Sequence, residues 1–304
     1  MITIKRILCP VDFFPASDRA VKYAAGLAAN YGARVHLLHA VAPIVSTPYE
    51  YPIATAEIMR AAEKASAGEM RKLAAKLEVK GVKVATELRI GAIHDVIKRA
   101  ISVFKPDLIA MGTHSRGGLE RLFMGSVSEW LIRHTPVPVL TMSAKERLTT
   151  PVFRKILVTT DFSDGTADAL DYAFSIAQEN DSQVTLLHVI SNLVVDIPSR
   201  YRDSLLSGVQ KRLEDLAPAE VRNWCDVTTR VEFGMPYRLI LRILGKEEPD
   251  LLVMNIHGKS LMDRAMIGST AERVVRAAKC PVLLIPPIKK SKTVGKTRTP
   301  RRAA

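Results

Sequence analysis

Short apolar runs alternate along the chain with longer stretches in which apolar residues recur at helical spacing. In the first half, strands are predicted at Lys5–Asp12, at Arg34–Val41, at Val82–Leu88 and in a run that ends at Gly112, and helices at Ala16–Tyr31, Ala54–Lys80 and 91–103. Strands that alternate with helices predict a parallel sheet covered on both faces, with right-handed crossovers.

The second half of the chain repeats this pattern. The run ending at Asp161 matches the run ending at Asp12, at an offset of 161 − 12 = 149. Gly268 matches Gly125 at 268 − 125 = 143, because the stretch after the second strand is shorter in the second copy. The chain is therefore predicted to be a tandem duplication of one domain of about 145 residues. We expect domains at residues 1–144 and 152–287, a linker at 145–151 and a basic tail at 288–304.

One element with candidate chemistry occurs once in each half, at residues 107–126 and 250–269. Each copy reads as an apolar strand, a polar glycine-bearing loop and a Gly-Ser pair that starts a helix. Backbone amides at such a helix start bind anions such as phosphate. The sequence therefore predicts a nucleotide site in each half.

These motifs resemble the universal stress protein family, over both halves from Lys5 to Ile285. The family signature is Gly, two residues, Gly, nine residues, Gly, then Ser or Thr. The first half has Gly112, Gly125 and Ser126 at these positions, with Ser115 in place of the second Gly.

The second half departs from the signature at another position. Asn255 stands for the first Gly, and Gly258, Gly268 and Ser269 follow at the required spacing. Both halves also carry the strand-ending acid and the Leu-Leu-His pattern of the family, as Asp12, Asp161, His39 and His188.

The resemblance implies an α/β fold of two tandem universal-stress-protein-like (adenine nucleotide alpha hydrolase-like) domains. Each would hold a five-stranded parallel sheet of order 3-2-1-4-5 with helices on both faces. That order reverses between strands 1 and 4, and a crevice forms at the carboxyl ends of strands at such a point. We therefore expect Asp12 and Gly112 to face each other across it.

The nucleotide-binding branch of the family implies a role for each motif position. Adenine would lie at the end of the second strand, the Asp would bind ribose hydroxyls, and glycine would let the backbone approach the sugar. The loop and the Gly-Ser helix start would bind the phosphates of ATP, accompanied by Mg²⁺. The implied residues are Asp12, Ala40, Val41, Gly112, His114, Ser115, Arg116, Gly117, Gly125, Ser126 and Val127 in the first half, and Asp161, Val189, Asn255, His257, Gly258, Lys259, Gly268, Ser269 and Thr270 in the second.

Structural alternatives stand beside these roles. Asp12 and Asp161 are also placed to cap the helix that follows, and the Asn255 side chain could occupy the space of the ribose. The histidines of the second strands are expected to be hydrogen-bonded core residues. His94 and Asp95 are expected at the surface, because adjacent helical residues do not face each other.

Composition limits the class of protein. The chain has 304 residues, 47% apolar and 25% charged, which is ordinary for a soluble globular protein. No apolar run approaches the roughly 18 residues of a membrane span, and the N-terminus lacks a signal-peptide pattern.

The three scattered cysteines are expected to be reduced, and a cytoplasmic location is expected. Seven of the net +13 charges lie in the tail, which suits contact with nucleic acid, an anionic surface or an acidic partner.

The sequence shows no pattern that would bring together a catalytic nucleophile, a base and a group that orients the base. It contains neither a Walker motif nor a Gly-x-Ser-x-Gly motif. We expect an ATP-binding stress or signalling protein that acts through a partner, with little or no hydrolysis. The alternatives are a nucleotide-independent scaffold, a slow ATPase and a protein that binds nucleic acid through its tail.

The apolar last strands, 137–142 and 282–285, are expected to pair and form an intrachain pseudo-dimer. A homodimer and the identity of a protein partner stay open.

Overall fold

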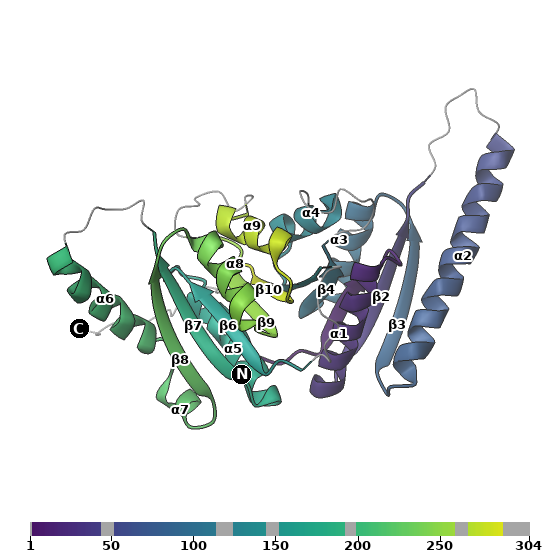
Figure 1. The fold of residues 1–304 in the computed structure, drawn as a ribbon. Helices are drawn as coiled ribbons and strands as arrows, with labels where there is room; N and C mark the ends of the chain where they lie inside the picture. Colours follow the sequence, from purple (N-terminus) through teal and green to yellow (C-terminus); the bar gives the residue numbers. More distant parts are fainter. Residues whose placement is uncertain are drawn as a thin grey trace, which may run out of the picture.

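The structure is a computed structural model that describes residues 2–43, 52–113, 124–143, 152–191, 199–258 and 267–287. Within this part the strands form one sheet with helices on both of its faces (Figure 1). The elements of the first half are β1 (Arg6–Pro10), α1 (Pro15–Tyr31), β2 (Arg34–Val41), α2 (Pro52–Glu78), β3 (Lys83–Ile90), α3 (Ile93–Phe104), β4 (Leu108–Gly112), α4 (Ser126–His134) and β5 (Val139–Met142). Those of the second half are β6 (Lys155–Thr160), α5 (Thr166–Asn180), β7 (Gln183–Ile190), α6 (Ser199–Glu214), α7 (Ala219–Arg222), β8 (Asp226–Phe233), α8 (Pro236–Glu247), β9 (Leu251–Asn255), α9 (Ser269–Ala277) and β10 (Val282–Ile285).

The strand order is β3-β2-β1-β4-β5-β10-β9-β6-β7-β8. Each half therefore has the expected order 3-2-1-4-5 in its own numbering, and all pairs within a half are parallel. The pair Ile7↔Leu108 places β1 beside β4, where the order reverses. The expected α/β fold of two tandem domains is confirmed.

The two halves join through their last strands. β5 and β10 pair antiparallel, with Leu140 opposite Leu283. The Thr141 hydroxyl adds a hydrogen bond of 3.1 Å to the carbonyl oxygen of Val282. The expected pairing of these two apolar strands is thus found, and it leaves neither of them as an open sheet edge.

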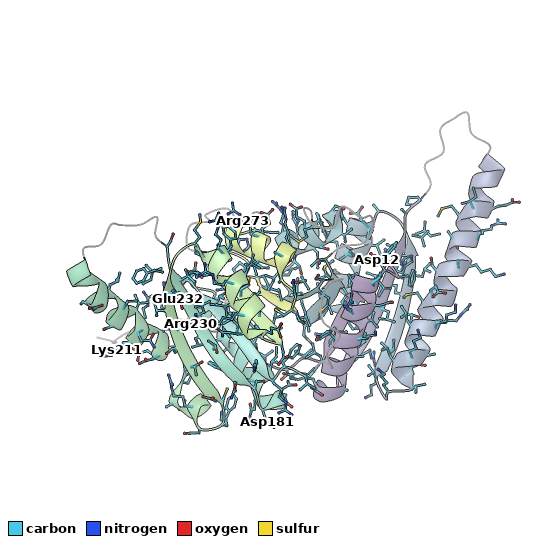
Figure 2. All side chains as sticks on the ribbon, viewed as in Figure 1. Asp12, Asp181, Lys211, Arg230, Glu232 and Arg273 are labelled. Carbon is cyan, nitrogen blue, oxygen red and sulfur yellow. The ribbon has the colours of Figure 1, made fainter. Side chains whose placement is uncertain are left out.

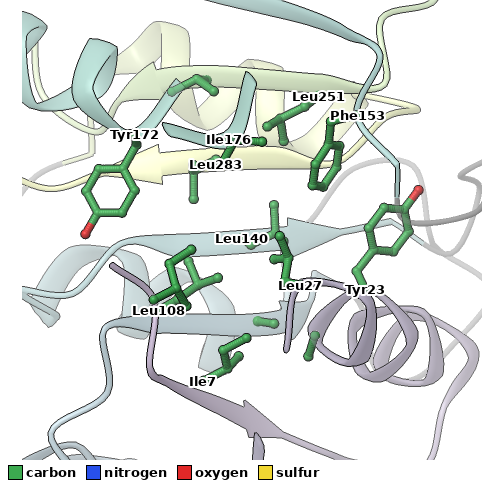
Figure 3. Close-up of a cluster of buried hydrophobic side chains, with 14 of the residues drawn as sticks. Ile7, Tyr23, Leu27, Leu108, Leu140, Phe153, Tyr172, Ile176, Leu251 and Leu283 are labelled. Atoms are coloured by element: carbon green, nitrogen blue, oxygen red, sulfur yellow. The ribbon is translucent and has the colours of Figure 1, made fainter. Parts of the chain in front are cut away.

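One hydrophobic core runs across this junction (Figure 3). Phe153, only 1% exposed, stacks on Tyr23 of α1 with ring centroids 5.9 Å apart. The backbone N–H of Ile2 donates to Ser175 Oγ on α5, at 2.8 Å. The segment before the first strand of each half therefore packs on the other half, and the cores of the two halves are continuous.

Helix α1 shows why the sequence gives close packing against the sheet. Its buried face is built largely of alanines, including Ala20, Ala24 and Ala28, which let the helix approach β4 and β5. The helix ends at Gly32, whose φ of 63° is a left-handed conformation that glycine adopts without strain. Apolar spacing and the terminating glycine both follow from the sequence.

Some element boundaries differ from those predicted. β3 extends to Ile90, two residues beyond the expected end, because its whole length pairs with β2. α7 was not predicted, since a single helical turn carries almost no periodicity. In the described part of the chain, no helix combines the length and the apolar character that crossing a membrane requires.

Candidate functional site

Asp12 lies in the loop between β1 and α1 (Figure 2). Its Oδ1 accepts a hydrogen bond from the amide of Phe14 at 3.1 Å, and its own amide donates to Ser17 Oγ at 3.2 Å. Helix α1 begins after Phe14 and has no side-chain cap. Asp12 therefore closes the loop between strand and helix, and the helix-capping alternative does not hold in the first half.

The surroundings of Asp12 change the acidity of its carboxyl. Burial raises the pKa of Asp12, and the hydrogen bonds with Phe14 and Ser17 oppose that rise. Burial disfavours the charged form because a carboxylate loses hydration there. A hydrogen-bond donor brought to this carboxylate would stabilise its charged form.

Gly112, at the end of β4, is in close contact with the start of α1. A Cβ placed on Gly112 would lie 2.8 Å from the Cβ of Ala16 and 2.8 Å from the amide nitrogen of Ser17. Ser17 therefore contacts both segments, since its hydroxyl accepts the Asp12 amide and its own amide lies against Gly112. The backbone that approaches Gly112 in this structure belongs to α1, whereas the sequence assigned that space to a sugar.

The start of α4 is tied to the end of β4 by two hydrogen bonds. The amide of Gly125 donates to the Thr113 carbonyl at 2.8 Å, and Ser128 Oγ donates to the Gly112 carbonyl at 3.0 Å. The Gly125 amide, expected to face a ligand, is thus already bonded. The amides of Ser126 and Val127 belong to the first helical turn, where no intrahelical acceptor exists, and α4 has no side-chain cap.

The second half repeats this helix start. The amide of Gly268 donates to the Ile256 carbonyl at 2.9 Å, and α9 then begins at Ser269 and Thr270, also without a side-chain cap. Because the same strand–helix connection forms twice from different sequences, it is a property of the Gly-Ser element. Its amides point out of the helix start in both halves.

Asp161 and Gly258 lie side by side in the second half. The Asp161 Oδ1 accepts a hydrogen bond from the Ser163 amide at 3.0 Å, as Asp12 does from Phe14. A Cβ on Gly258 would lie 2.9 Å from Asp161 Oδ2. The glycine at this position therefore leaves room for the carboxylate. Asp161 does not cap α5, whose N-cap is Gly165.

The Asn255 side chain lies against Gly165. In the amide orientation that satisfies both neighbours, its nitrogen donates to the Gly165 carbonyl at 3.0 Å and its oxygen accepts from the Thr166 amide at 3.3 Å. The start of α5 thus holds the side chain that the sequence placed in the space of the ribose. Gly165 occupies the position of Ala16, 149 residues earlier in the chain.

The expected adenine-binding positions lie at the ends of β2 and β7. Ala40 and Val41 end β2, and the Val41 carbonyl accepts a hydrogen bond from Gly91 at 3.0 Å. Val41 is buried, whereas Ala40 is half-buried. Val189 is half-buried in the same way near the end of β7. Ala40 and Val189, which are equivalent positions of the two halves, thus share the same partial exposure.

Sequence reasoning missed the phenylalanine that follows each strand-end Asp. Phe13 has a φ of 64°, a strained backbone for a bulky residue, and its ring centroid lies 4.5 Å from that of His39. His39 Nδ1 is hydrogen-bonded to the Val11 carbonyl at 2.7 Å, which confirms the expected core histidine. Phe162 and His188 repeat the arrangement, with a φ of 59° and the same 4.5 Å. The Asp-Phe pair occurs after the first strand of both halves, and this repetition in the sequence could have identified the phenylalanines.

Of the two residues expected at the surface, Asp95 is exposed, whereas His94 is half-buried. Its ring stacks on Trp130 of α4 at 4.6 Å between centroids, and its Nε2 is buried. The cause is that the first turn of α3 packs on α4, a contact between segments far apart in the sequence. Tyr237 and Arg273 form the equivalent pair in the second half, with the Arg273 guanidinium carbon 4.5 Å from the ring centroid.

Several expected site residues cannot be placed. His114, Ser115, Arg116, Gly117 and Lys259 lie outside the described residues. His257 is half-buried beside Gly258. Within the described residues, no three His, Cys, Asp or Glu side chains gather in a way that would hold a metal ion.

Comparison with known proteins gives consistent matches over both halves. The profile of the universal stress protein family matches residues 3–142 and again 153–286. A universal stress protein of Mycolicibacterium smegmatis is 28% identical over 291 residues, covering 92% of this chain and 97% of its own. One of Methanocaldococcus jannaschii is 32% identical over 145 residues, covering 46% of this chain and 85% of its own. The crystal structure of a universal stress protein from Archaeoglobus fulgidus aligns with a TM-score of 0.67 at 20% identity, covering 93% of this chain and 96% of that one.

Proposed function

Because the chain belongs to the universal stress protein family, we propose that it binds ATP with Mg²⁺ at the carboxyl ends of its strands and acts in a stress response through a protein partner. One observation carries this proposal. In the second half the strand-end Asp161 lies beside Gly258, and in both halves the same edge carries an uncapped Gly-Ser helix start.

The chemistry of these groups suits the parts of ATP. The aspartates accept hydrogen bonds, as ribose hydroxyls require, and a desolvated carboxylate such as Asp12 gains from such donors. The amides of Ser126 and Val127 are directed at an anion by the helix start. With no cluster of protein ligands for a metal among the described residues, Mg²⁺ would be held mainly by phosphate oxygens and water.

Both halves are proposed to bind. The direction of the Asn255 side chain supports this for the second half, since its hydrogen bonds to Gly165 and Thr166 keep it at the start of α5. Little or no hydrolysis is proposed, because the residues assigned to the phosphates supply charge and amides but no group that would direct an attacking water. The two domains, 1–144 and 152–287, would act as an intrachain pseudo-dimer in the cytoplasm.

Calorimetry of the full chain with Mg²⁺ and ATP tests the proposal. We expect two sites, and loss of one site in each of Ser126→Asp and Ser269→Asp. An acidic residue at a helix N-terminus stabilises the helix but repels a polyphosphate. Each variant should therefore keep its thermal stability while losing one site. Absence of binding at millimolar ATP would favour the scaffold alternative, and steady phosphate release would favour the ATPase.

The tail supports one further candidate function. Residues 288–304 carry seven Lys and Arg and no acid, which suits a nucleic acid or an anionic surface. Binding of DNA that weakens steeply with salt, and that is lost on deletion of 289–304, would establish it. ATP binding should survive this deletion.

A further inference from the structure

A cavity of about 600 Å³ lies at the edge of the first-half sheet where its strands begin, opposite the edge that carries Asp12. Its floor is formed by the first residues of β1, β2 and β3, and one wall by the end of α3. The volume is within the roughly 300–1,000 Å³ of small-molecule sites. The lining residues that the argument uses are Lys5, Arg6, Arg34, Lys83, Val103 and Phe104.

Three cations form a row across the floor of this cavity. Arg6 is paired directly with Arg34, and Arg34 with Lys83, on three adjacent strands. Neighbouring strands lie about 4.8 Å apart, and like charges directly opposite each other destabilise a sheet. The three like charges repel one another, and an anion that lies against them would relieve this repulsion.

Nearby acids neutralise this row only in part. Asp107 approaches Arg6 at 3.4 Å, while its Oδ2 accepts the amides of Lys5 and Arg6. Arg34 and Lys83 form no ion pair within the described residues.

The acid on the cavity floor, Glu87, is already paired. Its carboxylate contacts Arg89 at 2.7 Å and His36 at 2.9 Å, and these partners, Arg89 foremost, lower the pKa of Glu87. Hydrogen bonds with Arg89 and His36 engage both carboxylate oxygens, and Glu87 forms no ion pair with Arg34 or Lys83.

An apolar wall stands beside the cations. The Phe104 ring lies 4.7 Å from the ring of His36, and Val103 is 75% exposed. An exposed valine and a half-buried phenylalanine next to a cationic row suit a ligand that has both an anionic and an apolar part.

The duplication supplies an internal comparison. The equivalent row in the second half is Lys155, Gln183 and Asp226, in the same register and without adjacent like charges. Glu247 stands in place of Phe104 and forms a 2.6 Å ion pair with Arg230 of β8, which is labelled in Figure 2. The fold itself therefore does not require three adjacent cations at this edge.

We propose that the row of Arg6, Arg34 and Lys83 binds the phosphate group of a small molecule whose apolar part lies on Phe104 and Val103. Arginine suits a phosphate because its planar guanidinium donates two parallel hydrogen bonds. The site is separate from the proposed ATP crevice, so each can be removed without the other.

Phenyl phosphate is a suitable probe for the full chain, titrated by NMR with inorganic phosphate as a second ligand. Arg34→Gln, which installs the residue of the second half, should weaken phenyl phosphate binding about tenfold, the loss of one charge-assisted hydrogen bond. Lys83→Gln should act likewise. Phe104→Ala should weaken phenyl phosphate and leave inorganic phosphate unchanged.

The matched control is Lys155→Gln, in the corresponding row of the second half, which should leave binding at this cavity unchanged. Without ligand, Arg34→Gln should raise the thermal midpoint because it removes a like-charge contact. The proposal is overturned if phenyl phosphate binding does not saturate at millimolar concentration, if Lys155→Gln weakens it as much as Arg34→Gln does, or if Arg34→Gln and Lys83→Gln leave it unchanged.

Discussion

Asn255 packs on Gly165, and a Cβ at that glycine would come within 3.2 Å of the Asn255 Cγ. The first half has the opposite arrangement, with the small residue on the strand as Gly112 and the larger one on the helix as Ala16. In both halves the end of the fourth strand therefore packs closely on the start of the first helix, with the glycine on the strand in the first half and on the helix side in the second.

This relationship predicts the effect of Gly112→Ala. The new Cβ would meet the backbone of α1 at 2.8 Å, so the helix must shift. Overpacking of this kind costs about 1–3 kcal/mol in the free energy of unfolding, measured by urea denaturation. Adding Ala16→Gly should restore part of the loss, as a double-mutant cycle would show. Purely additive effects would contradict a direct contact between the two positions.

Gly258→Ala should act on the site rather than on the fold. Its Cβ would lie 2.9 Å from Asp161 Oδ2, and a carboxylate can rotate away more easily than backbone can move. We expect unchanged urea denaturation and loss of one of two ATP sites in calorimetry. Gly208→Ala in α6 is the control, since no atom lies within 4 Å of its Cβ position. Retention of both sites in Gly258→Ala would argue against a role for the Asp161 position.

Asp12→Asn should raise the thermal stability of the protein at neutral pH and lower its affinity for ATP. Burial raises the pKa of Asp12, so the folded state disfavours its charged form. The resulting loss of stability appears as pH rises through the carboxyl range and persists at neutral pH. The variant should therefore have a higher thermal midpoint than the wild type at pH 7 and an equal one at pH 3, where both side chains are neutral.

In the same variant, ATP affinity in the first half should fall at pH 7, since the carboxylate acceptor is lost. Asparagine can still accept the hydrogen bond from the Phe14 amide, so the loop should persist. A lower midpoint at neutral pH would show that the charge itself stabilises the fold.

Phe153→Ala should destabilise both halves together. The side chain is 1% exposed and stacks on Tyr23 in the shared core. Truncation of a buried phenylalanine costs about 3–5 kcal/mol, and chemical denaturation should still show a single transition because the core is continuous. Trp224→Ala, at a 41% exposed position, is the control and should have a much smaller effect. Two separate transitions in the wild type would refute a common core.

The sequence by itself determined the duplicated α/β fold, the strand-end aspartates and the Gly-Ser helix starts. Apolar periodicity, capping glycines and a constant offset between copies are properties of the linear chain, so no spatial information was needed. The same signals placed β2 and β10 at their observed bounds.

Only the tertiary structure decided how side chains from distant segments meet. It directed Asn255 to the start of α5, stacked His94 on Trp130 and set Arg6, Arg34 and Lys83 side by side. Each of these contacts depends on strand register or helix packing between segments many residues apart. Residue type and local spacing do not specify that register, because it follows from the packing of the whole sheet.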